Sequence, residues 1–265
     1  MQPLKGKIVF ISGASSGIGK ASAEAFAKAG SKLILCARSI DKIKALSAAL
    51  KEQYQTDSIP VELDVRKRAD VTAAIESLPE PWKHIDILVN NAGGALGMDK
   101  LHEGNPDDWD TMIDTNIKGL LYLTRQVVPL MLKYQLNGHV VNIGSTAGMH
   151  AYPNGAVYCA TKAAVQFISD GLRMDVVDTP IRVTNIQPGM TQTNFSNVRF
   201  HGDEQKAANV YEGITPLAPE DIADIIVYAT SAPSHVQICE VTVTPTHQAT
   251  GRVIYKKKQS GQSII

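Results

Sequence analysis

Short runs of β-branched and other apolar residues alternate with longer amphipathic stretches along most of this chain. Several of the short runs are apolar at almost every position, which is typical of strands that are covered by helices on both faces. Strands that are joined through helical crossovers must run parallel. The alternation therefore predicts an α/β fold with a doubly wound parallel sheet.

Seven strands are predicted, at residues 7–12, 32–37, 59–63, 85–90, 139–143, 182–187 and 238–243. Helical patterns lie near residues 18–29, 41–55, 68–78, 107–134, 155–177 and 219–229. This order is that of a Rossmann-type sheet of seven strands with helices on both faces.

The length of 265 residues suits one such domain, because α/β sheets often reach about 250 residues as a single unit. No linker rich in Pro, Gly and Ser divides the chain, and no repeat of fixed period is present. We expect one domain over residues 1–250. Residues 190–215 are expected to form an irregular substrate loop, since long loops in compact domains are often lids. Residues 251–265 are expected to form a solvated C-terminal tail.

Charge and cysteine usage restrict the partners. Lys plus Arg (26) balance Asp plus Glu (26), so the chain lacks the basic surface of a nucleic-acid-binding or peripheral membrane protein. No apolar run approaches the about 20 residues of a membrane span. Cys36, Cys159 and Cys239 are widely spaced, and no HExxH motif occurs, so we expect neither disulfides nor a metal. These features favour a cytoplasmic protein with a small-molecule partner.

The first predicted strand runs through a glycine-rich turn into a helix, with the sequence Ser12-Gly13-Ala14-Ser15-Ser16-Gly17-Ile18-Gly19. Glycines in this context let backbone amides approach a phosphate at the positive end of the helix. The turn therefore predicts a dinucleotide site, with a ligand-free tight turn as the alternative. A P-loop is disfavoured, because the first glycine of that motif is replaced by Ala14 and its magnesium-binding hydroxyl residue by Ala21.

The second predicted strand ends in Cys36-Ala37-Arg38-Ser39. An acidic residue at this point usually accepts hydrogen bonds from the ribose hydroxyls of NAD, but none is present here. Arg38 instead offers a permanently charged planar group that suits a phosphate, so the sequence favours NADP. The alternative is a solvated arginine at the start of a helix.

Tyr158 and Lys162 are four residues apart on a predicted helix. They therefore differ by about 40° around the helix axis and about 6 Å along it, which places both on one face. The ammonium group of Lys162 is expected to lower the pKa of the Tyr158 phenol from its reference value of about 10. Ser145 follows an apolar strand and can hold a carbonyl oxygen at the ligand-binding edge. These three residues predict acid–base chemistry on an alcohol or a carbonyl.

Together, the glycine-rich turn and the set Ser145, Tyr158 and Lys162 make the sequence resemble the short-chain dehydrogenase/reductase family. The resemblance extends from residue 7 to about residue 243. The matching motifs are the glycine-rich turn, Asp64-Val65, Asn90-Asn91-Ala92-Gly93, Asn116, Ser145, Tyr158-xxx-Lys162, Pro188-Gly189 and Thr193. Ser12 stands where the family more often has threonine, and both residues carry a small hydroxyl.

The resemblance implies specific roles for these positions. Asn116, Ser145, Tyr158 and Lys162 would be catalytic, with Asn116 holding a water that relays protons to Lys162. The residues expected to bind the cofactor are Gly13, Ser15, Ser16, Gly17, Ile18, Gly19, Arg38, Ser39, Asp64, Val65, Asn91, Ala92, Gly93, Tyr158, Lys162, Pro188, Gly189, Thr191 and Thr193. Among them, Asp64 and Val65 would contact the adenine, Asn91 and Gly93 the adenine ribose side, and Thr193 the nicotinamide carboxamide.

Five further segments resemble the NADP-dependent 3-hydroxy acid dehydrogenases within this family: residues 85–97, 110–116, 144–148, 151–153 and 195–200. The resemblance implies oxidation of serine, L-allo-threonine, 3-hydroxyisobutyrate and related acids, and reduction of the corresponding carbonyls. It also implies a homotetramer that pairs through the helices at about 107–134 and 155–177. The alternatives are a broad-specificity NADPH carbonyl reductase and a non-catalytic NADP-binding regulator. The complete set Asn116, Ser145, Tyr158 and Lys162 argues against the regulator.

A hydroxy acid carries a negative charge near its reacting carbon, so its binding site needs a cation or several amide donors. Arg199 lies in the expected substrate loop, and a guanidinium can bind a carboxylate through two parallel hydrogen bonds. We expect Arg199, together with Ser145 and Tyr158, to contact the substrate. The alternative is an exposed loop arginine or one that is paired with Asp203 or Glu204.

Overall fold

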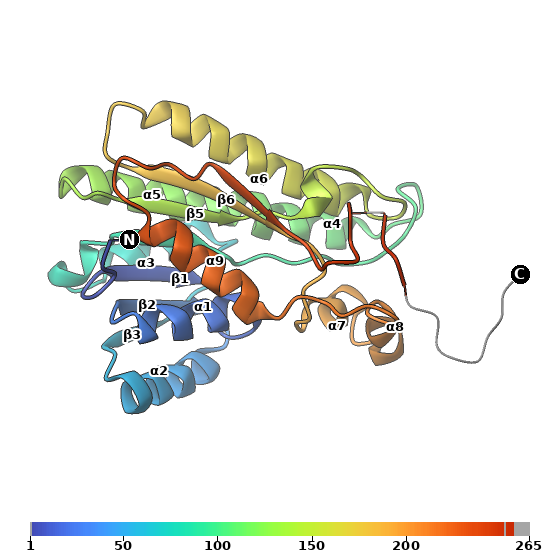
Figure 1. The fold of residues 1–265 in the computed structure, drawn as a ribbon, viewed down its shortest axis with the longest axis horizontal. Helices are drawn as coiled ribbons and strands as arrows, with labels where there is room; N and C mark the ends of the chain where they lie inside the picture. The colour runs from blue at the N-terminus through green and yellow to red at the C-terminus, as the bar shows by residue number, and fades with distance from the viewer. Residues whose placement is uncertain (1, 252, 257–265) are drawn as a thin grey trace, which may run out of the picture.

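The computed structural model describes residues 2–251 and 253–256, and within them seven parallel strands form one sheet in the order β3-β2-β1-β4-β5-β6-β7 (Figure 1). The strands are β1 (Ile8–Ser12), β2 (Lys32–Ala37), β3 (Ser58–Glu62), β4 (Ile87–Asn90), β5 (His139–Ile143), β6 (Arg182–Pro188) and β7 (Glu240–Val243). The predicted fold class is confirmed. The order reverses between β1 and β4, and ligands bind at such a switch point, outside the carboxyl ends of the strands.

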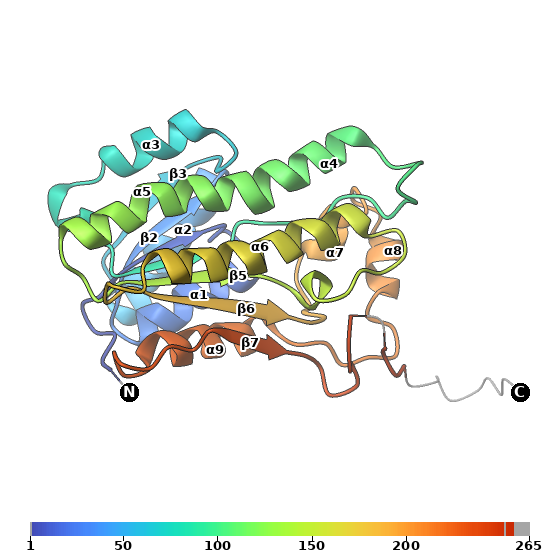
Figure 2. The ribbon, with the colours of Figure 1, turned by 90° about the horizontal axis from the view of Figure 1, so that it is seen from above.

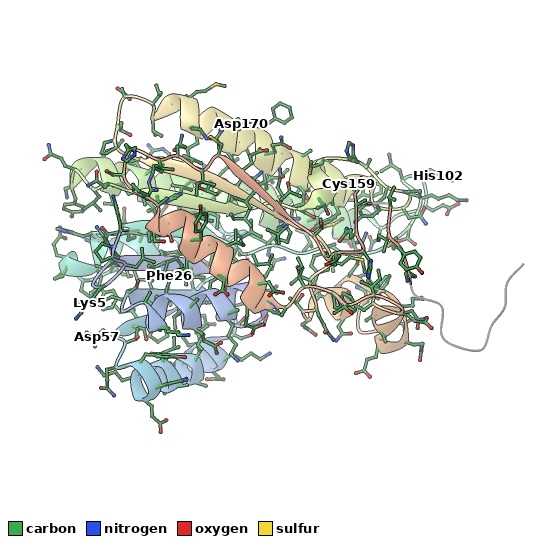
Figure 3. The ribbon with its side chains drawn as sticks, in the orientation of Figure 1. Lys5, Phe26, Asp57, His102, Cys159 and Asp170 are labelled. Atoms are coloured by element: carbon green, nitrogen blue, oxygen red, sulfur yellow. The ribbon has the colours of Figure 1, made fainter. Side chains whose placement is uncertain are left out.

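Helices cover both faces of the sheet. On one face lie α1 (Gly17–Lys28), α2 (Ile40–Tyr54) and α9 (Pro219–Ser231), and on the other lie α3 (Arg68–Glu76), α5 (Leu120–Lys133) and α6 (Ala156–Asp175). The side chain of Phe26, on α1, is fully buried between this helix and the sheet, whereas Asp57 lies at the surface (Figure 3). Coverage of both faces explains why the central strands are apolar at nearly every position.

The helix predicted near residues 107–134 is divided into three parts. The helix α4 (Pro106–Ile113) passes into a π-helical turn, η2 (Asp114–Gly119), and then into α5. Figure 2 shows α4 and α5 in one line beside α6. At the end of the π-helical turn, Gly119 packs so closely on Val65 that a Cβ atom would come within 2.6 Å of the valine methyl group. Such turns often occur at functional sites, and this one contains Asn116.

The expected irregular segment at residues 190–215 contains two short helices, α7 (Phe195–Arg199) and α8 (Glu204–Asn209). The side chain of Asp203 caps α8 by accepting a hydrogen bond from the backbone amide of Lys206 at 3.0 Å. Tyr211 ties the two ends of the segment together, because its hydroxyl donates to the carbonyl of Thr191 and contacts the Ser196 hydroxyl. Both helices lie beyond the ends of the strands (Figure 1).

Two single-turn 3₁₀ helices, η1 (Glu80–Lys83) and η3 (Thr146–Gly148), complete the helical elements of the described residues. Among these residues, no helix has the length and apolar character that a membrane crossing requires.

Candidate active site

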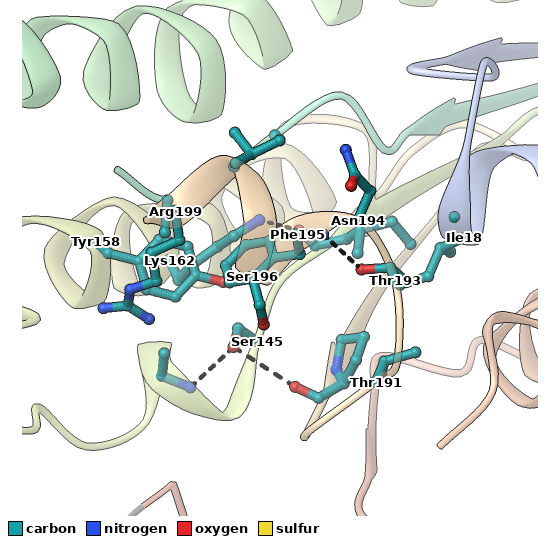
Figure 4. A pocket seen from close by; sticks show the side chains of 18 of the residues that line it. Ile18, Ser145, Tyr158, Lys162, Thr191, Thr193, Asn194, Phe195, Ser196 and Arg199 are labelled. Atoms are coloured by element: carbon teal, nitrogen blue, oxygen red, sulfur yellow. Dashed lines mark hydrogen bonds between the residues drawn. The ribbon is translucent and has the colours of Figure 1, made fainter. Parts of the chain in front are cut away.

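A cavity of about 1000 Å³ opens at the carboxyl edge of the sheet. The segments after β1 to β6 all contribute to its walls, and so do α7 and the chain around residue 250. All but two of the predicted site residues line it. The exceptions are Gly19 and Asn116. In Figure 4, Tyr158, Lys162 and Arg199 gather at one end of this pocket, and Ile18 and Thr193 lie at the other.

The glycine-rich turn adopts a backbone that only glycine tolerates easily. Gly13 has φ +67° and Gly17 has φ +53°, both in the left-handed region. A Cβ atom at Gly13 would lie 2.9 Å from Nδ2 of Asn91, and one at Gly17 would lie 3.2 Å from the Thr193 methyl group. Ser16 makes no side-chain cap for α1. The first amides of the helix therefore face a cradle that suits a phosphate group.

Asn91 holds this turn against the segment after β4. Its Nδ2 donates to the carbonyls of Ser12 at 2.9 Å and Gly13 at 3.2 Å. The Ser12 hydroxyl in turn accepts from the backbone amides of Asn91 and Ala92, both at 3.0 Å. Serine therefore supplies the hydroxyl for which the family more often uses threonine.

Gly19 has a packing role. A Cβ atom there would come within 2.5 Å of Nδ2 of Asn91 and would meet the carbonyl oxygen of Gly13 more closely still. The absence of a side chain at Gly19 lets α1 approach the turn. Gly19 does not line the cavity and instead packs against Gly13 and Asn91 of the turn.

The segments after β2 and β3 form another part of the pocket wall. They contribute Arg38, Ser39, Asp64, Val65 and Arg66. Arg66 binds Asp64 through Nε at 2.9 Å and through Nη2 at 2.6 Å. These hydrogen bonds, helped by the charge of Arg38, lower the pKa of the Asp64 carboxyl. Sequence reasoning missed Arg66, although a cation two positions after the acid of the Asp64-Val65 motif is a usable signal.

Ser145, Tyr158 and Lys162 meet in the same cavity. The Ser145 hydroxyl accepts from the amide of Ala147 at 3.1 Å and lies 3.5 Å from the carbonyl of Pro188 (Figure 4). Tyr158 is 8% exposed. Lys162 Nζ donates to the carbonyl of Ile143 at 2.8 Å, and burial lowers the pKa of this amine to about 8.

The expectation that Lys162 lowers the pKa of Tyr158 is not met in this structure. Burial raises the pKa of the Tyr158 phenol, and the nearby Tyr152 adds to that rise, whereas the Ser145 hydroxyl lowers it. The loss of hydration is the largest effect, because a phenolate is costly to form in an apolar environment. Tyr158 is thereby held as a neutral phenol.

Asn116 lies behind the cavity wall and connects it to α6. Its Nδ2 donates to the carbonyl of Gly94 and to the hydroxyl of Thr161, both at 2.9 Å, and its Oδ1 accepts from the amide of Gly94. A Cβ atom on Gly93 would lie 3.0 Å from Asn116 Oδ1 and 3.4 Å from Lys162 Nζ. Asn116 thus fixes the backbone that faces Lys162.

Arg199 is 9% exposed, so the alternative of an exposed loop arginine is wrong. Its Nη1 donates to the Tyr152 hydroxyl at 2.9 Å and its Nε to the carbonyl of Gly97 at 3.3 Å. Its Nη2 has no hydrogen-bond partner among the described residues. Asp203, the proposed partner in the same alternative, pairs with Lys206 instead.

The C-terminal segment also reaches the cavity. Gln248 is buried, and its Oε1 accepts from the amide of Met190 at 2.8 Å, directly after Gly189. Gly251 and Ile254 are partly buried and line the pocket. In the expected solvated tail, Val253 and Tyr255 are indeed exposed, whereas Gly251 and Ile254 contact the cavity. Residues 252 and 257–265 lie outside the described part of the chain. No sequence motif marks Gln248.

Throughout residues 2–251 and 253–256, no three His, Cys, Asp or Glu side chains are grouped to hold a metal ion.

Comparison with known proteins gives consistent matches. The short chain dehydrogenase family profile matches residues 7–204. An NADP-dependent 3-hydroxy acid dehydrogenase of Schizosaccharomyces pombe is 44% identical over 260 residues, which are 97% of this chain and 100% of that protein. The closed form of a serine dehydrogenase complexed with NADP+ has a TM-score of 0.88 and 42% identity, covering 95% of this chain and 100% of that one. Serine dehydrogenase from Escherichia coli has a TM-score of 0.78 and 39% identity, covering 91% and 99% of the two chains.

The packing of Gly19 leads to a first prediction. Gly19→Ala should lower the free energy of unfolding by about 1–3 kcal/mol, because the methyl group meets backbone that cannot move away. Gly171→Ala is the control, since nothing lies within 4 Å of a Cβ atom at that position in α6. The control should raise stability by about 0.5–1 kcal/mol. Urea unfolding of both variants measures the difference, and equal stabilities would contradict the close packing.

Proposed function

This chain belongs to the short-chain dehydrogenase family, and we propose that within it the protein oxidises the 3-hydroxyl of small 3-hydroxy acids and reduces the corresponding carbonyls. It is an NADP-dependent oxidoreductase acting on CH–OH donors. One observation carries the proposal: Ser145, Tyr158 and Lys162 share a cavity with the glycine-rich turn, Arg38 and a buried arginine, Arg199. The names of the relatives support the choice of serine, L-allo-threonine and 3-hydroxyisobutyrate as substrates.

The residues around the glycine-rich turn fit NADP. The cradle formed by Gly13, Gly17 and the open end of α1 suits the pyrophosphate. We assign Arg38, which lines the same cavity, to the 2′-phosphate, and the lowered pKa of the neighbouring Asp64 keeps that carboxyl ionised. We assign the nicotinamide side of the site to Pro188, Gly189, Thr191 and Thr193. When bound, NADP supplies the hydride chemistry, which belongs to the cofactor.

Tyr158 exchanges the proton with the substrate oxygen. In the reducing direction its raised pKa keeps the phenol protonated until it donates to the carbonyl oxygen. In the oxidising direction the same oxygen receives the proton of the substrate hydroxyl after its own proton has left. Lys162, whose pKa lies at about 8, can take up or release a proton near neutral pH. Asn116 orders the Gly93–Gly94 backbone opposite that amine.

Ser145 orients the substrate oxygen. Its hydroxyl already accepts from the amide of Ala147, so its own proton is directed outward toward Pro188 or toward a substrate oxygen. The contact with the Pro188 carbonyl is long, at 3.5 Å, and is easily exchanged for a better acceptor. Ser145 therefore holds the reacting oxygen within reach of Tyr158.

Arg199 binds the carboxylate of the substrate in this proposal. The charge of its guanidinium lowers the pKa of Tyr158, so the two groups interact across the site. The guanidinium carbon lies 5.6 Å from the centre of the Tyr158 ring. A 3-hydroxy acid has its carboxylate carbon only two bonds from the reacting carbon, so a cation near Tyr158 suits this class of substrate.

We further propose a homotetramer in the cytoplasm. Large apolar side chains are exposed on the two long helices, with Phe167 77%, Met174 73% and Leu132 45% exposed. Exposed apolar surface of this kind often marks contacts between subunits. The buried Cys36 and Cys159 are free thiols, as is usual in a reducing compartment. A particle mass of four chains, measured by light scattering, would support the tetramer, whereas a mass of one chain would refute it.

A substrate panel tests the proposed function. The purified protein is incubated with NADP or NAD and with serine, L-allo-threonine, 3-hydroxyisobutyrate or neutral secondary alcohols, and separately with NADPH or NADH and ketones. The absorbance of the reduced nicotinamide is followed, as it appears in the first assay and as it disappears in the second. We expect turnover of the acids with NADP. Turnover confined to neutral ketones would identify a carbonyl reductase, and the absence of all turnover would favour an NADP-binding regulator.

Tyr158→Phe keeps the ring but removes the proton-exchanging group. The turnover number should fall by about 10²- to 10⁴-fold, since positioned acid–base groups contribute that much. Binding of NADP, measured by fluorescence titration, should change little. Tyr228→Phe is the control, because Tyr228 is 53% exposed on α9 and remote from the cavity. Near-normal turnover in folded Tyr158→Phe would overturn the mechanism.

Arg38→Ala tests the recognition of the 2′-phosphate. A charge-assisted hydrogen bond contributes about 1.5–3 kcal/mol, so the Kd for NADP should rise by roughly 10- to 150-fold while the Kd for NAD changes much less. Arg68→Ala removes an exposed cation from α3 that does not line the cavity. That control should bind both cofactors normally. If Arg38→Ala raises the Kd for NADP and the Kd for NAD equally, Arg38 does not bind the 2′-phosphate.

Arg199→Leu tests the carboxylate contact. The kcat/KM for serine should fall by about 10-fold or more, in keeping with the loss of a charged hydrogen bond, while a neutral secondary alcohol should be affected much less. Lys206→Leu, which removes an exposed cation from the neighbouring helix α8, should change neither value. If kcat/KM falls equally for the acid and for the alcohol, Arg199 only stabilises the loop and does not bind the carboxylate.

A further inference from the structure

The geometry points to Tyr152 as a second specificity-determining residue: its hydroxyl, beside the free nitrogen of Arg199, completes a two-donor site for the carboxylate of the substrate. This inference rests on the proposed function for the identity of the acid. It concerns a residue of segment 151–153, to which the resemblance gave no role, and which lies between Ser145 and Tyr158 along the chain.

The ring of Tyr152 is held in a defined place on the cavity wall. It belongs to the small apolar cluster formed around Ala95, Met112 and Tyr158. It also lies directly on the backbone of Gly155, where a Cβ atom would come within 2.6 Å of three carbons of the ring. Glycine at position 155, just before α6, therefore provides the space that Tyr152 occupies. A side chain so confined presents its hydroxyl at one position.

The hydroxyl of Tyr152 has a proton to offer. Its oxygen already accepts from Nη1 of Arg199 at 2.9 Å, and a phenol that accepts one hydrogen bond can still donate another. Burial raises the pKa of Tyr152, so the group stays a neutral donor near physiological pH. The Cys159 thiol also interacts with this hydroxyl and adds to the rise in its pKa, and the thiol sulfur is a weak acceptor that a carboxylate oxygen can replace. The guanidinium carbon lies 5.4 Å from the centre of the ring, so both groups face the same space.

The neighbouring nitrogen of Arg199 needs an acceptor. Arg199 is nine-tenths buried, yet its Nη2 has no hydrogen-bond partner among the described residues. Leaving a buried charged donor unpaired is costly, and a carboxylate oxygen is the acceptor that best relieves that cost. One carboxylate oxygen can accept from Nη2 of Arg199 and the other from the hydroxyl of Tyr152.

The site is placed for a short acid. Tyr152 is near enough to Tyr158 to raise its pKa, and Arg199 is near enough to lower it. A carboxylate held by this pair therefore lies next to the phenol that exchanges the proton. A neutral alcohol of the same length would leave both donors unpaired. The pair thereby favours hydroxy acids over neutral alcohols by a difference in binding.

The test measures binding of a non-reacting acid and turnover separately. Propionate has a carboxylate but no hydroxyl, so its binding to the NADP-saturated protein, followed by NMR titration, reports the anion site without any reaction. Tyr152→Phe keeps the ring and removes only the hydroxyl. We expect the Kd for propionate and the KM for serine to rise by about 10-fold, while the KM for a neutral secondary alcohol changes much less.

The double variant Tyr152→Phe/Arg199→Leu separates donation from positioning. If Tyr152 only positions Arg199, the double variant binds propionate as Arg199→Leu does, and the inference is overturned. A further loss of about 10-fold in the double variant supports direct donation. Tyr228→Phe again serves as the control and should match wild type.

The two proposals fail in different ways. If the protein oxidises no 3-hydroxy acid while propionate binding still depends on Tyr152, the proposed function fails and the anion site stands. If serine is oxidised but Tyr152→Phe leaves both the KM and the propionate Kd unchanged, the inference about Tyr152 fails alone. Wild-type protein that binds no propionate would also refute the anion site.

Discussion

The close contact between the turn after β1 and the segment after β4 is the constraint on which the rest of the site depends. Gly13 and Gly19 leave room for the side chain of Asn91, which binds the carbonyls of Ser12 and Gly13. That contact places the following Gly93–Gly94 backbone against Asn116, and Asn116 reaches Thr161, the neighbour of Lys162, on α6. A chain of hydrogen bonds through Asn91 and Asn116 thus links the glycine-rich turn to the helix that carries Tyr158 and Lys162, so that both halves of the site keep one relative geometry.

Burial sets the proton chemistry at the other end of that chain. Tyr158 and Lys162 are both buried, and loss of hydration moves the pKa of each toward its neutral form: upward for the phenol and downward, to about 8, for the amine. The predicted attraction between an ammonium and a phenolate is therefore secondary in this structure. In the proposed mechanism the pair works as a neutral acid beside a base that titrates near neutrality, and the Ser145 hydroxyl counteracts the rise in the pKa of Tyr158.

The substrate selection that we propose depends on segments outside the cofactor motifs. The helix α7 carries Arg199, which is anchored to the segment after β4 through the carbonyl of Gly97 and to the segment after β5 through Tyr152. Gln248, from the C-terminal segment, holds the amide of Met190 where the substrate segment begins. Parts of the chain about a hundred residues apart thus meet around the proposed carboxylate site. Their contacts can change with little effect on the sheet, which suits a family whose members share one scaffold and differ in substrate.

The sequence by itself determined the sheet, the helices on its two faces and the edge at which the site lies, because hydrophobic periodicity and local turn chemistry are properties of consecutive residues. Spacing alone placed Tyr158 and Lys162 on one helix face, and both line the cavity. Only the tertiary structure decided that Gly19 packs the turn rather than lining the cavity, that Arg199 is buried, and that Tyr152 and Gln248 reach the site. Those outcomes depend on contacts between residues far apart in the chain and on the hydration that each group loses, and neither quantity can be read from a local pattern.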